Sequence, residues 1–400
     1  MAVELRRVAV DGSFDAILPD WSDLVFSQDF DPGALSFTYA MTGRNANLLT
    51  HGAELVCLLD GIEPADARFY LTQADGANLP ETDSSASRAY NLLSLRNRFN
   101  NLMVAPSTSS TVADQFAFDW TNKTPGQMVI DAIDNAMARA GGLITPSGPI
   151  TVAHPVSWLN NAMGFSPTTD SAGVAWPLYL DKTVDPGSSV ADLLKWLSDN
   201  GFAYPRMQGH TLNLYANLGT DRTTGSNPVV LASGKDLLDA SYQTDSSDLV
   251  NVLMVQGEST TSSTGSPVIV WVHDDASIAQ YGYREGQIQV TGLSTPLMLT
   301  RAGNAYLNLR KQVRYSYTYS QSASYLEQST AASGTFRPFV DYAVGDTILF
   351  LDGNQFAADR VRLLSASWPS ATTASVALTV NDFFADRSVE LDIRVGRLGG

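Results

Sequence analysis

The sequence predicts a mainly β protein that also contains α+β regions, and three observations support this fold class. Short runs rich in β-branched and aromatic residues, separated by turn residues, fill residues 1–110 and recur after residue 336. Two amphipathic helical patterns with clear start signals lie between these regions. Charged residues make up only 16% of the chain and apolar residues 44%, while Ser, Thr, Asn, Gly and Asp are abundant. With 400 residues, the chain is expected to contain several domains.

Residues 1–112 are predicted to form a first β domain, a small barrel or sandwich. The Asp11-Gly12 pair between the first two runs is the strongest hairpin signal in the chain. A short helix is expected at Asn91–Phe99, and the Ser-, Thr- and Pro-rich residues 105–113 are expected to be a linker. The predicted strands are Val3–Val10, Phe14–Leu18, Leu24–Gln28, Leu35–Ala40, Ala53–Leu59 and Arg68–Thr72.

Residues 113–220 are predicted to form a small α+β domain. Thr124, Pro125 and Gln127 are typical of a capped helix start, and Gly141-Gly142 is expected to end that helix. A second helix should begin at Ser188 or Ser189 and end at Gly201. Two strands, Phe202–Arg206 and Thr211–Tyr215, are predicted to follow as a hairpin that packs on the helices.

A second β-barrel is predicted to be interrupted by an insertion. The apolar run Leu249–Gln256 is expected to open this barrel, and its expected partners lie far downstream at Tyr342–Phe350, Arg360–Trp368 and Ala374–Val380. This interpretation assigns the barrel to residues 221–262 and 336–385. It also predicts that Val250, Val252 and Met254 share one core with the inward residues of Ala374–Val380.

Residues 263–335 are predicted to form the inserted α+β domain. Its expected elements are a strand at Val268–His273, a short helix at Ala276–Tyr281 capped by Asp274 or Asp275, a helix at Thr295–Gln312 and a strand at Val313–Ser320. Residues 386–400 are expected to form a C-terminal strand or extended arm.

The order of these segments resembles the tail hub proteins of tailed bacteriophages, the minor tail proteins of long-tailed phages related to the contractile-tail baseplate hub. The resembling segments are Ser188–Tyr215, Asp236–Gly257, Ile278–Glu285, Thr300–Leu309, Val344–Asp346 and Ser365–Phe383. None of them is a catalytic signature. The resemblance implies two similar barrels, one α+β domain between them and another inserted in the second barrel. It also implies a ring of three subunits with pseudo-sixfold symmetry.

The resemblance further implies a structural virion protein at the phage tail tip, made in the host cytoplasm. Such a hub joins the tail tube to fibres or spikes and lines the DNA exit path. The implied partners are distal tail or tail tube proteins, the tape measure protein, and tail fibre or spike proteins. The alternative is a virion-associated cell-wall or polysaccharide hydrolase, or a carbohydrate-binding tip protein.

Charge and hydropathy bear on the partners. The formal net charge of −16 argues against a broad phosphate-binding surface, so sequence-specific nucleic-acid binding is not expected. No apolar run approaches the ~18 residues of a membrane-spanning helix. No basic segment followed by an apolar run opens the chain, so no secretory signal is expected.

The search for chemistry predicts no catalytic, cofactor-binding or metal-binding residue, and no enzyme. The carboxylate pairs Asp29/Asp31 and Asp274/Asp275 are better explained by turns and helix caps than by glycoside hydrolysis. His51 and the single cysteine, Cys57, could form a nucleophile–base pair, but a buried apolar Cys57 is the preferred interpretation. The other histidines, His154, His210 and His273, show no metal-binding spacing.

Aromatic side chains leave one alternative open. Tyr315, Tyr317 and Tyr319 alternate along a predicted strand and could stack on sugar rings, but packing against the Thr295–Gln312 helix is preferred. The scattered tryptophans Trp120, Trp158, Trp176 and Trp271 are expected in the core or at interfaces.

Overall fold

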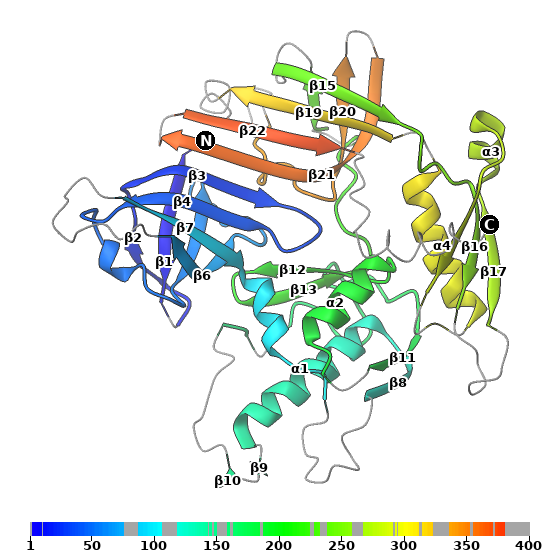
Figure 1. Ribbon diagram of the computed structural model, residues 1–400, viewed down its shortest axis with the longest axis horizontal. Helices are drawn as coiled ribbons and strands as arrows, with labels where there is room; N and C mark the ends of the chain where they lie inside the picture. The colour runs from blue at the N-terminus through cyan, green and yellow to red at the C-terminus, as the bar shows by residue number, and fades with distance from the viewer. Residues whose placement is uncertain are drawn as a thin grey trace.

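The computed structural model confirms a mainly β protein with few helices, and Figure 1 shows its strands and helices. It describes residues 2–9, 11–75, 87–105, 118–142, 144–145, 148–149, 158–160, 163–184, 187–224, 228–232, 238–257, 267–290, 293, 295–311, 314–322, 336–352, 355–370 and 373–380. Within these residues no helix is both long and apolar enough to span a membrane. Of the predicted linker at 105–113, only Ala105 is among the described residues. The predicted C-terminal arm at 386–400 lies wholly outside them.

The elements follow one another as three groups. The first group is β1 (Val3–Val8), β2 (Phe14–Ile17), β3 (Trp21–Gln28), β4 (Ala34–Ala40), η1 (Ala46–Leu48), β5 (Glu54–Leu59), β6 (Arg68–Asp75), β7 (Ser87–Ser94) and η2 (Leu95–Asn101). The second is β8 (Phe118–Lys123), α1 (Pro125–Gly142), β9 (Ile144–Thr145), β10 (Gly148–Pro149), β11 (Leu180–Val184), α2 (Val190–Asp199), β12 (Tyr204–Gln208) and β13 (Thr211–Tyr215). The third is β14 (Val230–Ala232), β15 (Leu238–Asp245), β16 (Val252–Gln256), β17 (Ile269–His273), α3 (Asp275–Tyr281), β18 (Glu285–Gln289), α4 (Pro296–Arg310), β19 (Arg314–Ser322), β20 (Thr347–Asp352), β21 (Gln355–Ser370) and β22 (Thr373–Val380).

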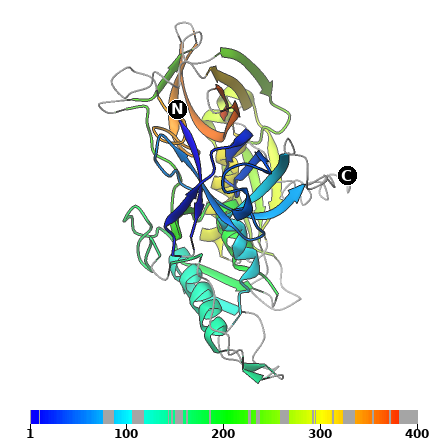
Figure 2. The same cartoon turned by 90° about the vertical axis from the view of Figure 1, so that its left-hand side faces the viewer.

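One 13-stranded sheet joins the two ends of the chain. Its main path is β15-β19-β22-β21-β3-β4-β7-β6-β5-β1-β2, and β20 links β14 to β21 off this path. The long strand β21 connects the two halves, because Leu364–Ser367 pairs with β3 on one side and with β22 on the other. Figures 1 and 2 show the N-terminal strands beside β21 and β22.

A single hydrophobic core underlies this joined sheet. It contains residues of the first group, such as Phe26 and Phe69, together with Phe339 and Trp368 from the end of the chain. The Phe26 ring lies 5.7 Å from that of Phe69 and 4.6 Å from that of Phe339, centroid to centroid. The two sequence-distant β regions therefore bury their apolar faces together, not separately.

Local signals predict the first group well, with one error. Gly12 has φ +84° in the turn between the antiparallel strands β1 and β2, as the Asp11-Gly12 pair predicts. The helix predicted at Asn91–Phe99 is wrong in its first half, because β7 continues to Ser94 and the 3₁₀ helix η2 starts at Leu95. Leu92, which looks like part of a helical face, is a buried strand residue of the main sheet.

The middle group has the predicted helices and hairpin. The Ser189 hydroxyl accepts a hydrogen bond from the Asp192 backbone N–H, and the Asp192 carboxylate accepts one from the Ser189 backbone N–H, which completes a capping box. At the start of α1, only one of the two hydrogen bonds of a capping box forms. The Thr124 hydroxyl accepts from the Gln127 N–H, but the Gln127 side chain donates to Asp131.

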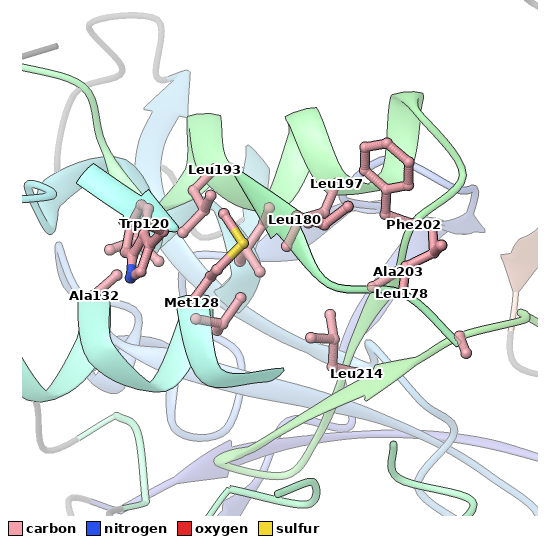
Figure 3. Packing of buried hydrophobic residues seen from close by; sticks show 14 of the residues in the cluster. Trp120, Met128, Ala132, Leu178, Leu180, Leu193, Leu197, Phe202, Ala203 and Leu214 are labelled. Atoms are coloured by element: carbon pink, nitrogen blue, oxygen red, sulfur yellow. The ribbon is translucent and has the colours of Figure 1, made fainter. Parts of the chain in front are cut away.

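The second core lies between the helices and the hairpin of this middle group. Figure 3 shows α1 and α2 facing each other, with Met128 and Ala132 opposite Leu193, and with Leu180 between the helices. The same cluster continues into residues of the third group, including Leu253, Val272 and Leu299. The end of α2 lies close to α4 of the third group: a Cβ added to Gly201 would lie 2.8 Å from the Ala305 Cβ.

The predicted role of Leu249–Gln256 is wrong. Strand β16 pairs with β17 and β18 in a separate three-stranded sheet and not with any strand of the large sheet. Leu253 and Val255 belong to the second core and Val250 packs against it, whereas Val376 and Leu378 belong to the first. An apolar run specifies a buried strand but not its partner, and helix α4 covers the buried face of this one.

The predicted assignment of Val313–Ser320 to the insertion is also wrong. Strand β19 pairs with β15 and β22, so the large sheet resumes at residue 314 and not near residue 336. Strand β15, which the sequence analysis did not assign, is the last strand of the sheet before the chain leaves it. The segment outside the large sheet therefore runs from about Ser246 to Lys311.

Candidate functional site

Buried charged side chains gather at the junction between the β12–β13 hairpin and the first half of the large sheet. The buried Asp66 carboxylate lies 2.8 Å from Nη1 of Arg206 on β12 and 3.4 Å from Nη1 of Arg96 in η2. All three side chains are at most 7% exposed. Both guanidinium groups also donate to backbone carbonyls, Arg206 to Asp29 and Arg96 to Phe30.

The backbone locks this carboxylate in place. The Asp66 N–H donates to the Met207 carbonyl and the Met207 N–H donates to Asp66 Oδ1, each at 2.7 Å. Asp66 has φ +55°, a left-handed conformation that Asp tolerates better than most residues. Burial lowers the pKa of the Arg96 guanidinium, and the Asp66 carboxylate opposes that effect. The charges therefore depend on one another to remain buried.

A second ionic cluster holds the turn of the same hairpin. Nε2 of His210 lies 2.7 Å from Oε1 of Glu54, and the Gly209 N–H donates to Glu63. Arg68 lies between the two carboxylates, 3.4 Å from Glu54 and 2.8 Å from Glu63. Burial acts to lower the pKa of Arg68, but hydrogen bonds and charge from the two glutamates outweigh it and raise the pKa.

A third junction fixes the end of the middle group to the second half of the sheet. Asp346 Oδ1 accepts from the Thr220 N–H at 2.6 Å, and Oδ2 lies 3.3 Å from Nε of Arg222. Arg360 donates to the carbonyls of Leu218 and Gly345. These clusters hold the middle group against both halves of the sheet.

None of the three clusters is predicted by the sequence. Their members are far apart in the chain, such as Asp66 and Arg206, and each charged residue alone resembles a solvated surface residue. The one available signal is the Gln208-Gly209 turn, which predicts a hairpin but not its contact with the sheet.

The carboxylates considered for catalysis have structural roles. Asp274 is the N-cap of α3: its side chain accepts from the Ser277 N–H at 2.9 Å and lies 2.8 Å from Lys311 Nζ. The hydrogen bonds from Lys311 and Ser277 lower the pKa of Asp274. Asp275 instead has a side chain 89% exposed, 3.5 Å from His273. Of the two predicted caps, Asp274 is therefore the one that forms.

We expect Asp274→Ala to destabilise the insertion by about 1–2 kcal/mol, because α3 loses its cap and Lys311 loses its partner. Chemical denaturation of the purified chain, monitored by a probe in the insertion, measures this. Asp275→Ala is the matched control and should change stability by less than about 0.5 kcal/mol. Because the pKa of Asp274 is lowered by folding, its contribution should persist above an Asp pKa of about 4 and fade in more acidic solution. Equal effects of the two variants would contradict this assignment.

Cys57 and His51 do not form a nucleophile–base pair, and the preferred interpretation of Cys57 as a buried apolar residue is confirmed. Cys57 is fully buried in β5, and burial raises its pKa to about 12, so its thiol is unreactive at neutral pH. His51 lies exposed in the turn before β5. Asp29 and Asp31 flank Phe30 in the turn after β3, and Asp29 accepts from the Phe30 N–H. His154 lies outside the described residues, and among those described no group of His, Cys, Asp and Glu could hold a metal ion.

The aromatic candidates divide into two groups. Trp120, Trp158 and Trp176 are buried in the second core, as predicted, whereas Trp271 is 54% exposed on β17. The side chains of Tyr315, Tyr317 and Tyr319 lie outside the described part of the structure. Their strand, β19, runs between β15 and β22, and helix α4 covers β16 and β17. The predicted packing of these tyrosines against this helix stays a prediction, because their side chains are not described.

Comparison with known proteins relates the chain to phage tails through its fold. No family model and no curated protein matches the sequence. The structure is similar to the 43 kDa tail protein of prophage MuSo2 from Shewanella oneidensis, with TM-score 0.58, 12% identity and coverage of 95% of this chain and 98% of that one. It is also similar to a tail protein from Neisseria meningitidis MC58, with TM-score 0.58, 13% identity and 98% of both chains covered. For the prophage tail protein gp18 of Listeria monocytogenes EGD-e, the TM-score is 0.56 at 12% identity, over 100% of both chains.

All three solved structures are described as tail proteins, two of them from prophages, and the shared fold extends over nearly the whole chain. The resemblance to phage tail proteins that the sequence suggests is thereby confirmed at the level of the fold.

Proposed function

We propose that this chain is a structural hub protein of a phage tail tip, which joins the tail tube to fibres or spikes. The observation that carries the proposal is fold similarity to three tail proteins, two of them from prophages, over 95–100% of the chain. The buried Asp66 and Asp346 clusters support it, because they tie the middle group to both halves of the sheet. A connecting protein needs such rigid joints, whereas catalysis needs an accessible set of reactive groups.

In this proposal the large sheet contains two similar hub barrels that meet at the β3–β21 pairing. The first comprises β1–β7 and the second comprises β14, β15 and β19–β22. The middle α+β domain lies between them in sequence, and the inserted α+β domain extends from about residue 246 to residue 311. These boundaries replace those predicted at residues 262 and 336.

We further propose that three copies form a ring around the DNA exit path, so that six barrels meet a sixfold tail tube. The partners are then the distal tail or tail tube protein, the tape measure protein, and fibre or spike proteins. The protein is made in the host cytoplasm and functions in the virion. An overall charge of −16 suits a channel wall from which DNA phosphates are repelled.

We expect a trimer when the protein assembles. Native mass spectrometry of the purified chain, alone and mixed with its tail tube protein, measures the number of copies. Electron microscopy of the particle places them and shows their symmetry. A stable hexamer, with one chain per tube subunit, would contradict the pairing of two barrels per copy.

The alternative is a cell-wall or polysaccharide hydrolase. Incubating the purified chain with host cell walls and following turbidity and released reducing sugar separates the two functions. The hub proposal expects no release above a heat-treated sample. Release that a single Asp or Glu substitution removes would establish the hydrolase and overturn a purely structural role.

A further inference from the structure

The three-stranded sheet β17-β16-β18 has one face covered and one face open. Helix α4 covers the inner face: a Cβ added to its Gly303 would lie 2.6 Å from Val255 and 2.9 Å from Val272. On its other side α4 meets the end of α2, where Ala305 approaches Gly201. The opposite face of the sheet is therefore turned away from the middle group, and Figure 1 shows β17 at the outer margin of the molecule.

Strand register defines this outer face. Its central row is Trp271, Met254 and Gln287, which lie beside one another on β17, β16 and β18. The outer face as a whole consists of Ile269, Trp271, His273, Val252, Met254, Gln256, Glu285, Gln287 and Gln289. Ile269 and Trp271 are 49% and 54% exposed, which is high for large apolar side chains.

Polar groups of the outer face lie mainly on β18, opposite the exposed tryptophan. Gln287 donates to Gln256 across the strands at 3.3 Å. Just beyond the strand, Tyr283 is 64% exposed and its hydroxyl donates to Glu285 at 2.5 Å. The outer face therefore has an aromatic edge on β17 and an edge of amide and carboxylate groups on β18.

Charge restricts what can bind here. The nine positions of the outer face include one carboxylate, Glu285, and no Lys or Arg. An anionic ligand such as a phosphate or a uronic acid polymer would meet the Glu285 carboxylate and no Lys or Arg, and the one imidazole, of His273, lies beside the Asp275 carboxylate. Amides and a carboxylate suit a neutral ligand with many hydroxyl groups, which both donate and accept hydrogen bonds.

Size argues against a protein partner. Three strands about 4.8 Å apart and five residues long span roughly 10 by 13 Å. A stable protein interface buries about 800 Å² on each partner and has an extended apolar core. Here the exposed apolar side chains are few and polar groups border them directly. The outer face is the size of a short stretch of a sugar chain.

We propose that this outer face binds a neutral polysaccharide. A sugar ring above Met254 places its apolar face against Trp271 and its hydroxyl groups within reach of Gln287, Gln256 and Glu285. The site rests on the register and exposure of these residues alone, and it does not depend on the hub role or on oligomeric state.

Affinity electrophoresis tests the proposal with the full chain. Native gels contain dextran, galactomannan or soluble starch as neutral probes, or polygalacturonate as an acidic one. We expect at least one neutral probe to retard the protein and polygalacturonate to have no effect. Trp271→Ala should weaken the apparent affinity about tenfold or more, as expected for the loss of one stacked aromatic ring, and Gln287→Ala should weaken it less.

Tyr179→Ala is the matched control, because Tyr179 is 59% exposed but lies just before β11, outside this sheet. The affinity of the Tyr179→Ala variant for the neutral probes should equal that of the parent chain. Thermal unfolding verifies that each variant folds. If Trp271→Ala does not fold, the loss of affinity in Gln287→Ala is used to test the proposal instead.

Three results overturn the proposal. They are no retardation by any neutral probe, equal retardation of the parent and both outer-face variants, and equal retardation by the acidic probe. Self-association that Trp271→Ala removes, without any polysaccharide effect, would show that the face is a protein contact instead.

Discussion

Asp66→Asn is expected to destabilise the protein by about 3–5 kcal/mol, because the substitution removes the negative charge from between two buried arginines. Arg206 lies 2.8 Å from this carboxylate and Arg96 lies 3.4 Å from it. Asparagine has the same shape and tolerates the φ of +55°, so the backbone is not the cause of the loss. Urea denaturation followed by tryptophan fluorescence measures the free energy of unfolding.

Asp199→Asn is the matched control. Asp199 pairs with Lys195 on the surface of α2 at 3.3 Å, with side chains 32% and 42% exposed, and its loss should cost less than about 1 kcal/mol. If Asp66→Asn costs no more than this control, the Asp66 cluster does not hold the hairpin to the sheet. A double variant that also replaces Arg206 by Met should recover part of the stability, because one uncompensated buried charge is removed.

The sequence predicts elements whose signals are local. The capping box of Ser189 and Asp192 and the Gly12 turn are both formed by residues within a few positions of one another. The turn at Gly12 and the start of α2 at Ser189 appear in the structure where the sequence places them. Helix α4 starts at Pro296, directly after Thr295, for the same reason, although Thr295 makes no side-chain cap hydrogen bond.

Strand pairing is less predictable because it depends on distant residues. Val252–Gln256 is apolar enough for either sheet, and nothing within it specifies β17 and β18 as partners. Strand β19 illustrates the converse case. Its polar alternation suits an insertion as well as the large sheet, and its pairing with β22 spans more than fifty residues.

The junction clusters could not be predicted for a further reason. A buried charge is recognisable only from its partner, and the partners here are 140 residues apart for Asp66 and Arg206 and 124 for Arg222 and Asp346. The outer face of β16–β18 is an intermediate case. Trp271 and its alternation with Val270 and Val272 are visible in the sequence, but the polar edge on β18 appears only with the strand register.

Gly219→Ala is expected to open the joint between the middle group and the second half of the sheet. A Cβ at Gly219 would lie 2.0 Å from the carbonyl carbon and oxygen of Gly345, which are backbone atoms and cannot rotate away. The same position has φ +82°, which costs a non-glycine residue about 1 kcal/mol or more. Separating the two segments at Gly219 and Gly345 breaks the hydrogen bond from the Thr220 N–H to Asp346, so the total loss should exceed about 3 kcal/mol.

Gly173→Ala separates steric overlap from backbone strain. Gly173 has φ +79°, nearly the same as Gly219, but a Cβ there would meet no atom within 4 Å. Its substitution should therefore cost only the strain of about 1 kcal/mol. Hydrogen exchange of the Thr220 and Thr347 amides reports on the joint, and we expect faster exchange in Gly219→Ala alone. Equal losses of stability and equal exchange in the two variants would mean that strain, not the close approach of Gly219 to Gly345, explains the effect.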